Sequence, residues 1–207
     1  MRRILTKFFY YLGVIIGYCF TEKLLNNILF VVNHLKAGLL FSKFKSCGKN
    51  LYIEAPVKVI GGKNIVIGNN CSIYARTRFE TFKYSDKHTP ELIIGDNVNI
   101  IFDCHIGCVN KVIIGNNVLI ASKVFITDHY HGEITKTGIA MPPSERPIYS
   151  KGPVIIEDNV WIGEGVAIMP NITIGRNCII GANSVVTKSF PQNSILAGVP
   201  AKLIKVV

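Results

Sequence analysis

The residues best suited to acid–base chemistry stand together in one short segment, Thr127–Gly132, which reads Thr-Asp-His-Tyr-His-Gly. It holds two of the five histidines of the chain, His129 and His131. Residues two apart on an extended backbone face the same side, so we expect these two histidines to present together. Asp128 and Tyr130 should then face the opposite side. A neutral histidine can take the proton of a hydroxyl group near pH 7, although paired histidines in a polar loop are also typical of solvated residues.

Six-residue repeats govern the sequence beyond about residue 60 and must position this segment. Aliphatic residues recur every six positions at Ile156, Ile162, Ile168, Ile174, Ile180 and Val186. Shorter runs of the same frame begin at Ile67, Ile94 and Ile114. A period of six fits neither an amphipathic helix nor a simple alternating strand, and it requires one short strand and one turn per repeat. The frame predicts an all-β repeat structure, because an ordinary β-sandwich has no reason to keep a frame of six residues over so many repeats.

This pattern resembles the hexapeptide repeat of the left-handed parallel β-helix acyltransferases, in which three hexads make one triangular coil. The resemblance implies a left-handed parallel β-helix of about five to six triangular coils. We expect this domain to occupy residues 51–207 and to follow an N-terminal helical segment at residues 1–50.

Three insertions interrupt the frame, and their positions indicate where a substrate would bind. Nine residues are inserted after the hexad of Phe79, two after that of Ile106 and 24 after that of Ile126. Each insertion follows the third hexad of a triplet, so all three loops should lie at one corner of the prism, with the active-site loop at residues 127–154. The walls of this predicted acceptor site are residues 80–91, 107–111 and 127–152.

From Ile114 to Lys205 the chain resembles the sugar O-acetyltransferases that modify galactosides, maltose and, most closely, bacterial O-antigen and capsular polysaccharides. The passages that carry the resemblance are IGNNVLIASKVFITDHYHG, IIEDNVWIGEGVAIMPNITIG, IIGANSVVTKSF and AGVPAKLIK. In the galactoside enzymes the catalytic base stands five residues after the inward aliphatic residue that opens the loop. The resemblance therefore implies His131 as the base, five residues after Ile126, with His129 as its neighbour or substitute.

The same resemblance implies acetyl-CoA as co-substrate and no metal. Trp161, the only tryptophan, matches the family's tryptophan beside the acyl-CoA channel, and it also fits packing between subunits. The other expected contacts of the coenzyme are Gly163, Glu164, Ala182, Thr187, Lys188, Lys202 and Lys205. On the acceptor side we expect Asp128, Tyr130 and His105. The acceptor oxygen should attack the thioester directly, because the cysteines at inward hexad positions should be buried.

Two departures from the galactoside-acetylating members concern the acceptor and leave the transfer chemistry intact. Ile101 stands where those members carry an asparagine, and Val109 stands where they carry an acidic acceptor ligand. The predicted function is therefore acetyl-CoA-dependent O-acetylation of a sugar hydroxyl in bacterial surface polysaccharide biosynthesis. The alternatives are N-acetylation of an amino sugar, a non-catalytic β-helix scaffold, and a γ-type carbonic anhydrase with zinc on His105, His129 and His131.

Basic charge is concentrated in residues 1–50, which hold eight Lys/Arg and one Glu and so carry +7 of the net charge of +10. Nucleic acid is therefore not an expected partner of the repeat region. The same segment holds the apolar stretches Phe8–Phe20 and Leu24–Phe41; the longest unbroken run has 13 residues, so no spanning helix is predicted. Basic and apolar residues together predict a segment on an anionic membrane surface. The alternatives are helices packed on their own domain and a signal peptide, for which no cleavage site follows.

The cysteines and the resemblance together predict the protein's surroundings. No CxxC motif occurs, and Cys71, Cys104 and Cys178 fall at a repeat position for small buried residues, as expected in a reducing compartment. We therefore expect a cytoplasmic homotrimer, peripheral on the inner face of the bacterial inner membrane, acting on a sugar or a lipid-linked oligosaccharide.

Overall fold

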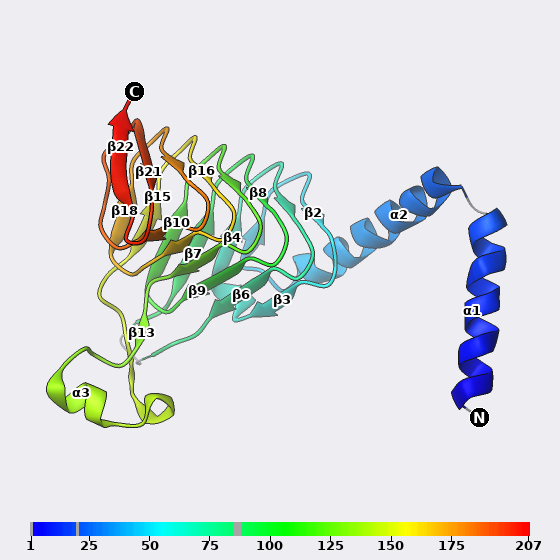
Figure 1. Ribbon diagram of the computed structural model, residues 1–207, viewed down its shortest axis with the longest axis horizontal. Coiled ribbons are helices and arrows are strands. Elements are labelled where there is room, and N and C mark those ends of the chain that lie inside the picture. Colours follow the sequence, from blue (N-terminus) through cyan, green and yellow to red (C-terminus); the bar gives the residue numbers. More distant parts are fainter. Residues whose placement is uncertain (1, 20, 85–87) are drawn as a thin grey trace.

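The computed structural model describes residues 2–19, 21–84 and 88–207, and its body is a prism with three faces of short parallel strands (Figure 1). Sheet A contains β1 (Ser46–Cys47), β4 (Ile65–Ile67), β7 (Glu91–Ile94), β10 (Lys111–Ile114), β15 (Val154–Ile156) and β18 (Ile172–Ile174). Sheet B contains β2 (Tyr52–Ile53), β5 (Ser72–Ile73), β8 (Asn99–Ile100), β11 (Leu119–Ile120), β16 (Trp161–Ile162), β19 (Ile179–Ile180), β21 (Ser194–Ala197) and β22 (Lys202–Val206). Sheet C contains β3 (Lys58–Ile60), β6 (Arg78–Thr81), β9 (His105–Cys108), β12 (Phe125–Thr127), β17 (Ala167–Ile168) and β20 (Val185–Val186). The chain visits the sheets in the order A, B, C, and β21 and the antiparallel β22 close the end of the prism.

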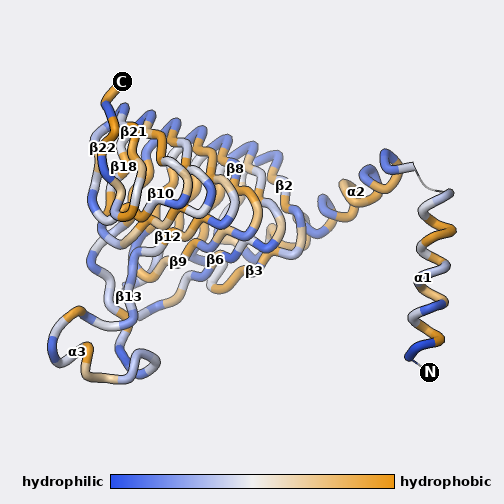
Figure 2. The backbone as a smooth tube through the Cα atoms, viewed as in Figure 1, coloured by the Kyte–Doolittle hydropathy of each residue, from blue (hydrophilic) through white to orange (hydrophobic). Residues whose placement is uncertain are grey.

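The core is the inside of the prism, and the hexad frame predicts its members correctly. The aliphatic frame residues from Ile67 to Val186 are buried, as are Cys71, Cys104 and Cys178. Burying each such aliphatic side chain contributes about 1.5–3 kcal/mol, so the stack of coils stabilises itself. In Figure 2 apolar and polar residues alternate along the strands, as a one-sided core requires.

The first coil begins earlier than the sequence analysis placed it. Its strands β1, β2 and β3 carry Cys47, Ile53 and Val59, which keep the six-residue step and belong to the core or pack against it. A cysteine and a valine at two of the three positions made this coil less visible than the isoleucine-rich ones. The prism therefore starts at Ser46 rather than at residue 51.

A ladder of asparagines holds the coils in register at the turn between sheets A and B. The side-chain amide of each asparagine donates to the side-chain oxygen of the next, at 2.9–3.1 Å. The members are Asn50, Asn70, Asn97, Asn117, Asn159, Asn177 and Asn193. All have φ between 56° and 61°, a left-handed conformation that asparagine tolerates better than most residues. The ladder explains why this turn carries asparagine in coil after coil.

Two helices precede the prism, α1 (Arg2–Cys19) and α2 (Glu22–Phe41), and α2 projects from the end of the prism near β2 (Figure 1). Thr21 caps α2 by accepting a hydrogen bond from the Leu24 N–H at 3.3 Å. The C-terminal part of α2 is docked through the buried Asn33 and Ala37, and one turn earlier the ring of Phe30 stacks on that of Tyr52 with centroids 6.4 Å apart. The Asn33 amide also contacts the Tyr52 hydroxyl at 3.4 Å.

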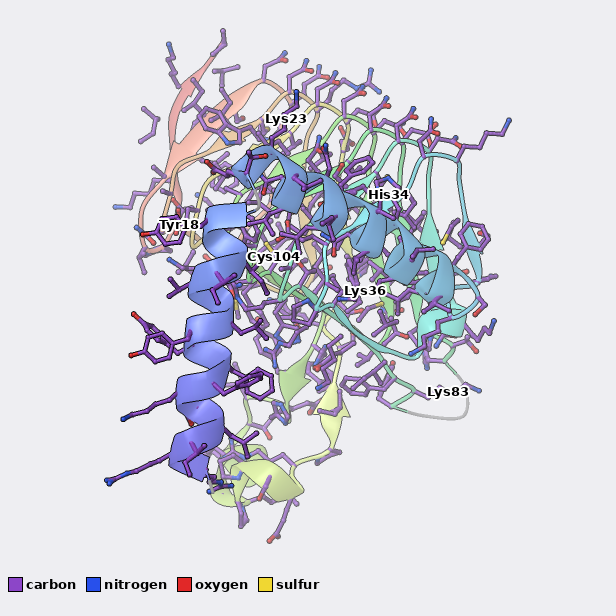
Figure 3. The ribbon with its side chains drawn as sticks, turned by 90° about the vertical axis from the view of Figure 1, so that its right-hand side faces the viewer. Tyr18, Lys23, His34, Lys36, Lys83 and Cys104 are labelled. Carbon is purple, nitrogen blue, oxygen red and sulfur yellow. The ribbon has the colours of Figure 1, made fainter. Side chains whose placement is uncertain are left out.

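The remaining surface of both helices is open to solvent. All side chains from Arg2 to Tyr18 are exposed, and in Figure 3 the α1 side chains stand out from the ribbon. The alternative in which both helices pack on their own domain is therefore wrong except for the end of α2. By length and composition α2 is apolar enough to cross a membrane, which a count of unbroken apolar runs missed because polar residues interrupt it.

Candidate active site

The three insertions lie at one corner, as expected. Each leaves sheet C and returns to sheet A, between β6 and β7, β9 and β10, and β12 and β15. Residues 85–87 of the first loop lie outside the described residues. The longest loop leaves the prism as an arm (Figure 1), formed by the antiparallel strands β13 (Tyr130–His131) and β14 (Ile148–Tyr149), the helix α3 (Lys136–Ala140) and 3-10 turns such as Pro143–Glu145.

Asp128 anchors the start of this arm to the preceding coil of the prism. Its carboxylate is fully buried and accepts hydrogen bonds from the backbone N–H groups of Val109, Asn110 and Lys111 at 2.7–3.2 Å. Its carbonyl oxygen accepts from the Ser150 hydroxyl at 2.8 Å. Three N–H donors and one charged acceptor form a strong, directional contact. Asp128 thus has a positioning role, and its burial contradicts the expectation that it binds substrate.

His129 is held on two sides next to this carboxylate. Its Nδ1 lies 3.1 Å from Oδ1 of Asp128 and 3.0 Å from the Thr127 hydroxyl oxygen. The ring of Phe82 meets it edge to face with centroids 5.3 Å apart. A Cβ added to Gly107 would lie 3.0 Å from Cε1 of His129, so the imidazole rests directly on the backbone of β9. The side chain is 12% exposed, enough to meet a substrate while its ring is fixed.

The hydrogen bonds of His129 assign its neutral tautomer. A carboxylate can only accept, so Nδ1 must carry the proton. Among the described residues Nε2 has no hydrogen-bond partner, and it carries the lone pair. A histidine oriented through Nδ1 by a buried carboxylate, with Nε2 free, is the arrangement of a general base.

His131 and Tyr130 lie on the arm, where the expected pairing of the two histidines fails. The backbone bends at Asp128, so the alternation of sides does not continue from β12 into β13. His131 pairs with Ile148 and is exposed. Burial raises the pKa of Tyr130, which lines a cavity of about 350 Å³ on the arm together with Tyr149 and Lys151. The structure brings Asp128 and His129 together and leaves His131 out.

His105 on β9 lies within a polar network on the outside of sheet C, one strand away from β12, which leads to His129. Its Nε2 is 3.2 Å from Oε2 of Glu80, and its Nδ1 is 2.9 Å from Nη2 of Arg78. Glu80 also accepts from Nζ of Lys58 at 2.8 Å. Burial, and then the charge of Arg78, lower the pKa of His105. Both nitrogens of the ring are engaged, so His105 offers a lone pair to neither a proton nor a metal ion.

The sequence placed Glu80, Phe82 and Gly107 in the walls of the predicted acceptor site but gave none of them a role of its own. A signal was present, because Glu80, Gly107 and Thr127 each directly follow the inward residue of a third hexad. Those three positions are in register on β6, β9 and β12 and therefore adjoin one another.

Four of the expected coenzyme residues lie at another corner, where sheet B passes into sheet C. Trp161 on β16 is 52% exposed. Gly163 follows it, and a Cβ there would lie 2.7 Å from the backbone nitrogen of Ala182, so these residues stack across two coils. Glu164 is exposed and pairs with Lys123 at 2.9 Å.

The other expected coenzyme residues lie elsewhere on the protomer. Thr187 and Lys188 follow β20 at the corner from which the arm leaves the prism, and the Lys188 ammonium lies 5.6 Å from the Phe190 ring centroid. Lys202 and Lys205 are exposed on β22, opposite Ala197 and Ile195. One protomer therefore divides the expected coenzyme residues between two corners and an edge strand.

Comparisons with known proteins agree with the repeat. The family described as Bacterial transferase hexapeptide (six repeats) matches residues 153–188. The chain is 44% identical over 118 residues to the putative lipopolysaccharide biosynthesis O-acetyl transferase WbbJ of Escherichia coli K12, covering 55% of this chain and 60% of WbbJ, less than two thirds of that protein. It is 36% identical over 173 residues to the galactoside O-acetyltransferase of the same strain, covering 82% of this chain and 68% of that enzyme.

Among solved structures, the chain is similar to AntD, an N-acyltransferase from Bacillus cereus in complex with dTDP and 3-hydroxybutyryl-CoA. The TM-score is 0.69 and the identity 24%, covering 83% of this chain and 87% of AntD. At this identity the likeness concerns the fold alone. Together with the hexapeptide match it fits a left-handed parallel β-helix.

Proposed function

Because the chain belongs to the hexapeptide-repeat family of sugar acetyltransferases, we propose that it transfers the acetyl group of acetyl-CoA to a hydroxyl group of a sugar. The observation that carries the proposal is the hydrogen bond between the buried Asp128 carboxylate and Nδ1 of His129. This pair supports His129 as the base in place of His131. A scaffold without catalytic function does not require an oriented imidazole at the corner where the three inserted loops meet, so this arrangement favours an enzyme.

The reaction proceeds in one ternary complex. Nε2 of His129 takes the proton of the acceptor hydroxyl while its oxygen attacks the thioester carbonyl, so a C–O bond forms and the C–S bond breaks. The imidazolium is stabilised by Asp128 and returns the proton to the coenzyme thiolate. No acetylated cysteine is needed, since burial and the neighbouring Asp128 raise the pKa of the Cys108 thiol and keep it neutral.

The active form is a homotrimer, with acetyl-CoA bound between neighbouring prisms. The separation of Trp161, Gly163 and Ala182 from the His129 corner supports this arrangement, because one protomer's coenzyme residues can then face the next protomer's base. The exposed Trp161 and Leu119 occupy paired positions on β16 and β11 and offer an apolar contact.

We expect the full-length protein in mild detergent to have three times the chain mass by light scattering. Replacing Leu119 with Arg, on the exposed face, should yield monomers that retain the fold but lose activity. A monomer with full activity at every dilution would contradict this assembly.

The acceptor is a sugar of a bacterial surface polysaccharide, and the product is an ester. Similarity to WbbJ supports the pathway, and Ile101 and Val109 argue against a galactoside. The test incubates the full-length protein with acetyl-CoA and methyl glycosides of galactose, glucose and mannose, with glucosamine as the amine, and measures thiol release. Mass spectrometry before and after mild alkali separates an ester, which is hydrolysed, from an amide. Release of thiol with glucosamine alone would establish N-acetylation instead, and no transfer to any sugar would refute the proposal.

The helices α1 and α2 attach the enzyme to the cytoplasmic face of the inner membrane, where a lipid-linked acceptor would be held. Exposed apolar residues line both helices, among basic residues that outnumber the single acid, Glu22. An interfacial position fits better than a spanning one, because α2 contacts the prism from Phe30 onward. The free part, residues 22–29, is then about 12 Å long, against about 30 Å of hydrocarbon.

We expect the full-length protein to sediment with vesicles that contain anionic phosphatidylglycerol, and less so in high salt. Changing Phe8, Phe9, Ile15 and Ile16 to Ser should weaken this binding by about 100-fold or more, since each loses an apolar side chain from the interface. The control is Ile134→Ser, an apolar residue on the arm that is 83% exposed, more than any of these four. Equal sedimentation of the two variants would show that α1 does not make the contact.

A further inference from the structure

Glu80 occupies the place next to the base on the outer face of sheet C. It is the register partner of Gly107, on whose backbone the His129 ring rests. Adjacent strands are about 4.8 Å apart, so Glu80 stands next to the backbone segment on which the His129 ring rests. Gly107 has no side chain to separate the two. A sugar that presents one hydroxyl to Nε2 of His129 can therefore bring a second hydroxyl toward Glu80.

The Glu80 carboxylate is fixed and ionised. Lys58 donates to Oε1 at 2.8 Å, and this hydrogen bond is the main cause that lowers the pKa of Glu80, although burial acts against it. His105 donates from Nε2 to Oε2 at 3.2 Å. A carboxylate has about four lone-pair sites, so two remain for a ligand. Such a group accepts hydrogen bonds and cannot donate them.

His105 fixes the direction of Glu80 instead of acting on the substrate as a base. Arg78 donates from Nη2 to Nδ1 at 2.9 Å, which places the ring proton on Nε2 facing Glu80. The two histidines therefore present opposite tautomers. His129 keeps a free lone pair, whereas His105 uses both nitrogens to hold the carboxylate.

We propose that Glu80 is the acceptor-binding residue of this enzyme and accepts a hydrogen bond from a second hydroxyl of the sugar whose first hydroxyl is deprotonated by His129. The proposal rests on the proposed function and specifies its acceptor as a sugar with at least two free hydroxyl groups. It accounts for Ile101 and Val109, which supply no polar side chain to an acceptor, Val109 being fully buried.

The test compares Glu80→Gln with Glu157→Gln, which removes an exposed carboxylate in the turn between β15 and β16, where it accepts a hydrogen bond from the backbone N–H of Arg176 at 2.8 Å. The acceptor is the methyl glycoside that the wild-type enzyme acetylates fastest. Glu80→Gln should raise the KM for this sugar by about 10- to 100-fold, the range for a hydrogen bond to a charged group. The KM for acetyl-CoA should stay unchanged and kcat should fall by less than about threefold, because the base is intact. Glu157→Gln should leave all three constants unchanged.

Monodeoxy derivatives of the same glycoside identify the hydroxyl. With the wild-type enzyme, the KM for one deoxy derivative should exceed that for the parent sugar by the same factor as the Glu80→Gln change produces. With Glu80→Gln, removing the same hydroxyl should raise the KM little further. An unchanged acceptor KM in Glu80→Gln, or an equal change in Glu157→Gln, would overturn the role of Glu80 while acetyl transfer stands. Failure of the wild-type enzyme to acetylate any sugar is a different result, which removes the proposed function and this role with it.

Discussion

Replacing His129 with Ala should lower kcat/KM for acetyl transfer by about 10²- to 10⁴-fold, the range for loss of a general base. His131→Ala should change it by less than about threefold, because that side chain is exposed on β13 and no described group orients it. Steady-state thiol release with saturating acetyl-CoA measures both effects. Binding of acetyl-CoA should survive in both variants, and the fluorescence of Trp161, the only tryptophan, provides the titration.

The two histidine variants are matched, since they lie two residues apart and remove the same side chain. If His131→Ala is the damaging change and His129→Ala is mild, the arm must fold over the prism during catalysis and carry the base with it. Loss of coenzyme binding in His129→Ala would instead make His129 a binding residue and leave the base unassigned.

Replacing Asp128 with Asn should damage both activity and stability, because one carboxylate serves two purposes. An amide can present its NH₂ to Nδ1 of His129 or to the backbone N–H groups, and either choice sets donor against donor. We expect kcat to fall by about 10²-fold or more, because the proton of His129 is no longer held on Nδ1 and Nε2 is no longer kept free. Unfolding free energy should fall by about 3 kcal/mol, since several buried N–H groups lose a charged acceptor. Thermal unfolding and thiol release measure the two effects.

Asp103→Asn is the control for Asp128→Asn. Asp103 has φ of 62°, a conformation that asparagine accepts, and its partner Arg76 is exposed. Loss of one exposed ion pair should cost less than about 1 kcal/mol and leave the turnover unchanged. If Asp128→Asn retains the wild-type kcat, Asp128 is structural only and His129 takes its tautomer from Thr127.

The amino-acid sequence by itself determined the prism and the corner at which the loops meet. Each hexad encodes one strand and one turn locally, so the inward residues from Ile67 to Val186 can be counted without knowing the fold. The insertions then fall at one corner because they all follow third hexads. The family of the protein and the two candidate histidines were also accessible, since the motif around His129 and His131 stands in one segment.

Only the tertiary structure decided which histidine is the base and what surrounds it. The donors that hold Asp128 come from residues 109–111, a full coil earlier, and they bend the chain where local alternation predicts a straight strand. Glu80 meets His105 at a sequence separation of 25, and that register depends on loops of unequal length. The exposure of α1 was likewise decided by the tertiary structure, because an apolar helix of this length could also have packed on the prism. A local pattern specifies which way a residue points within its own strand, but a partner from another coil depends on how the coils stack.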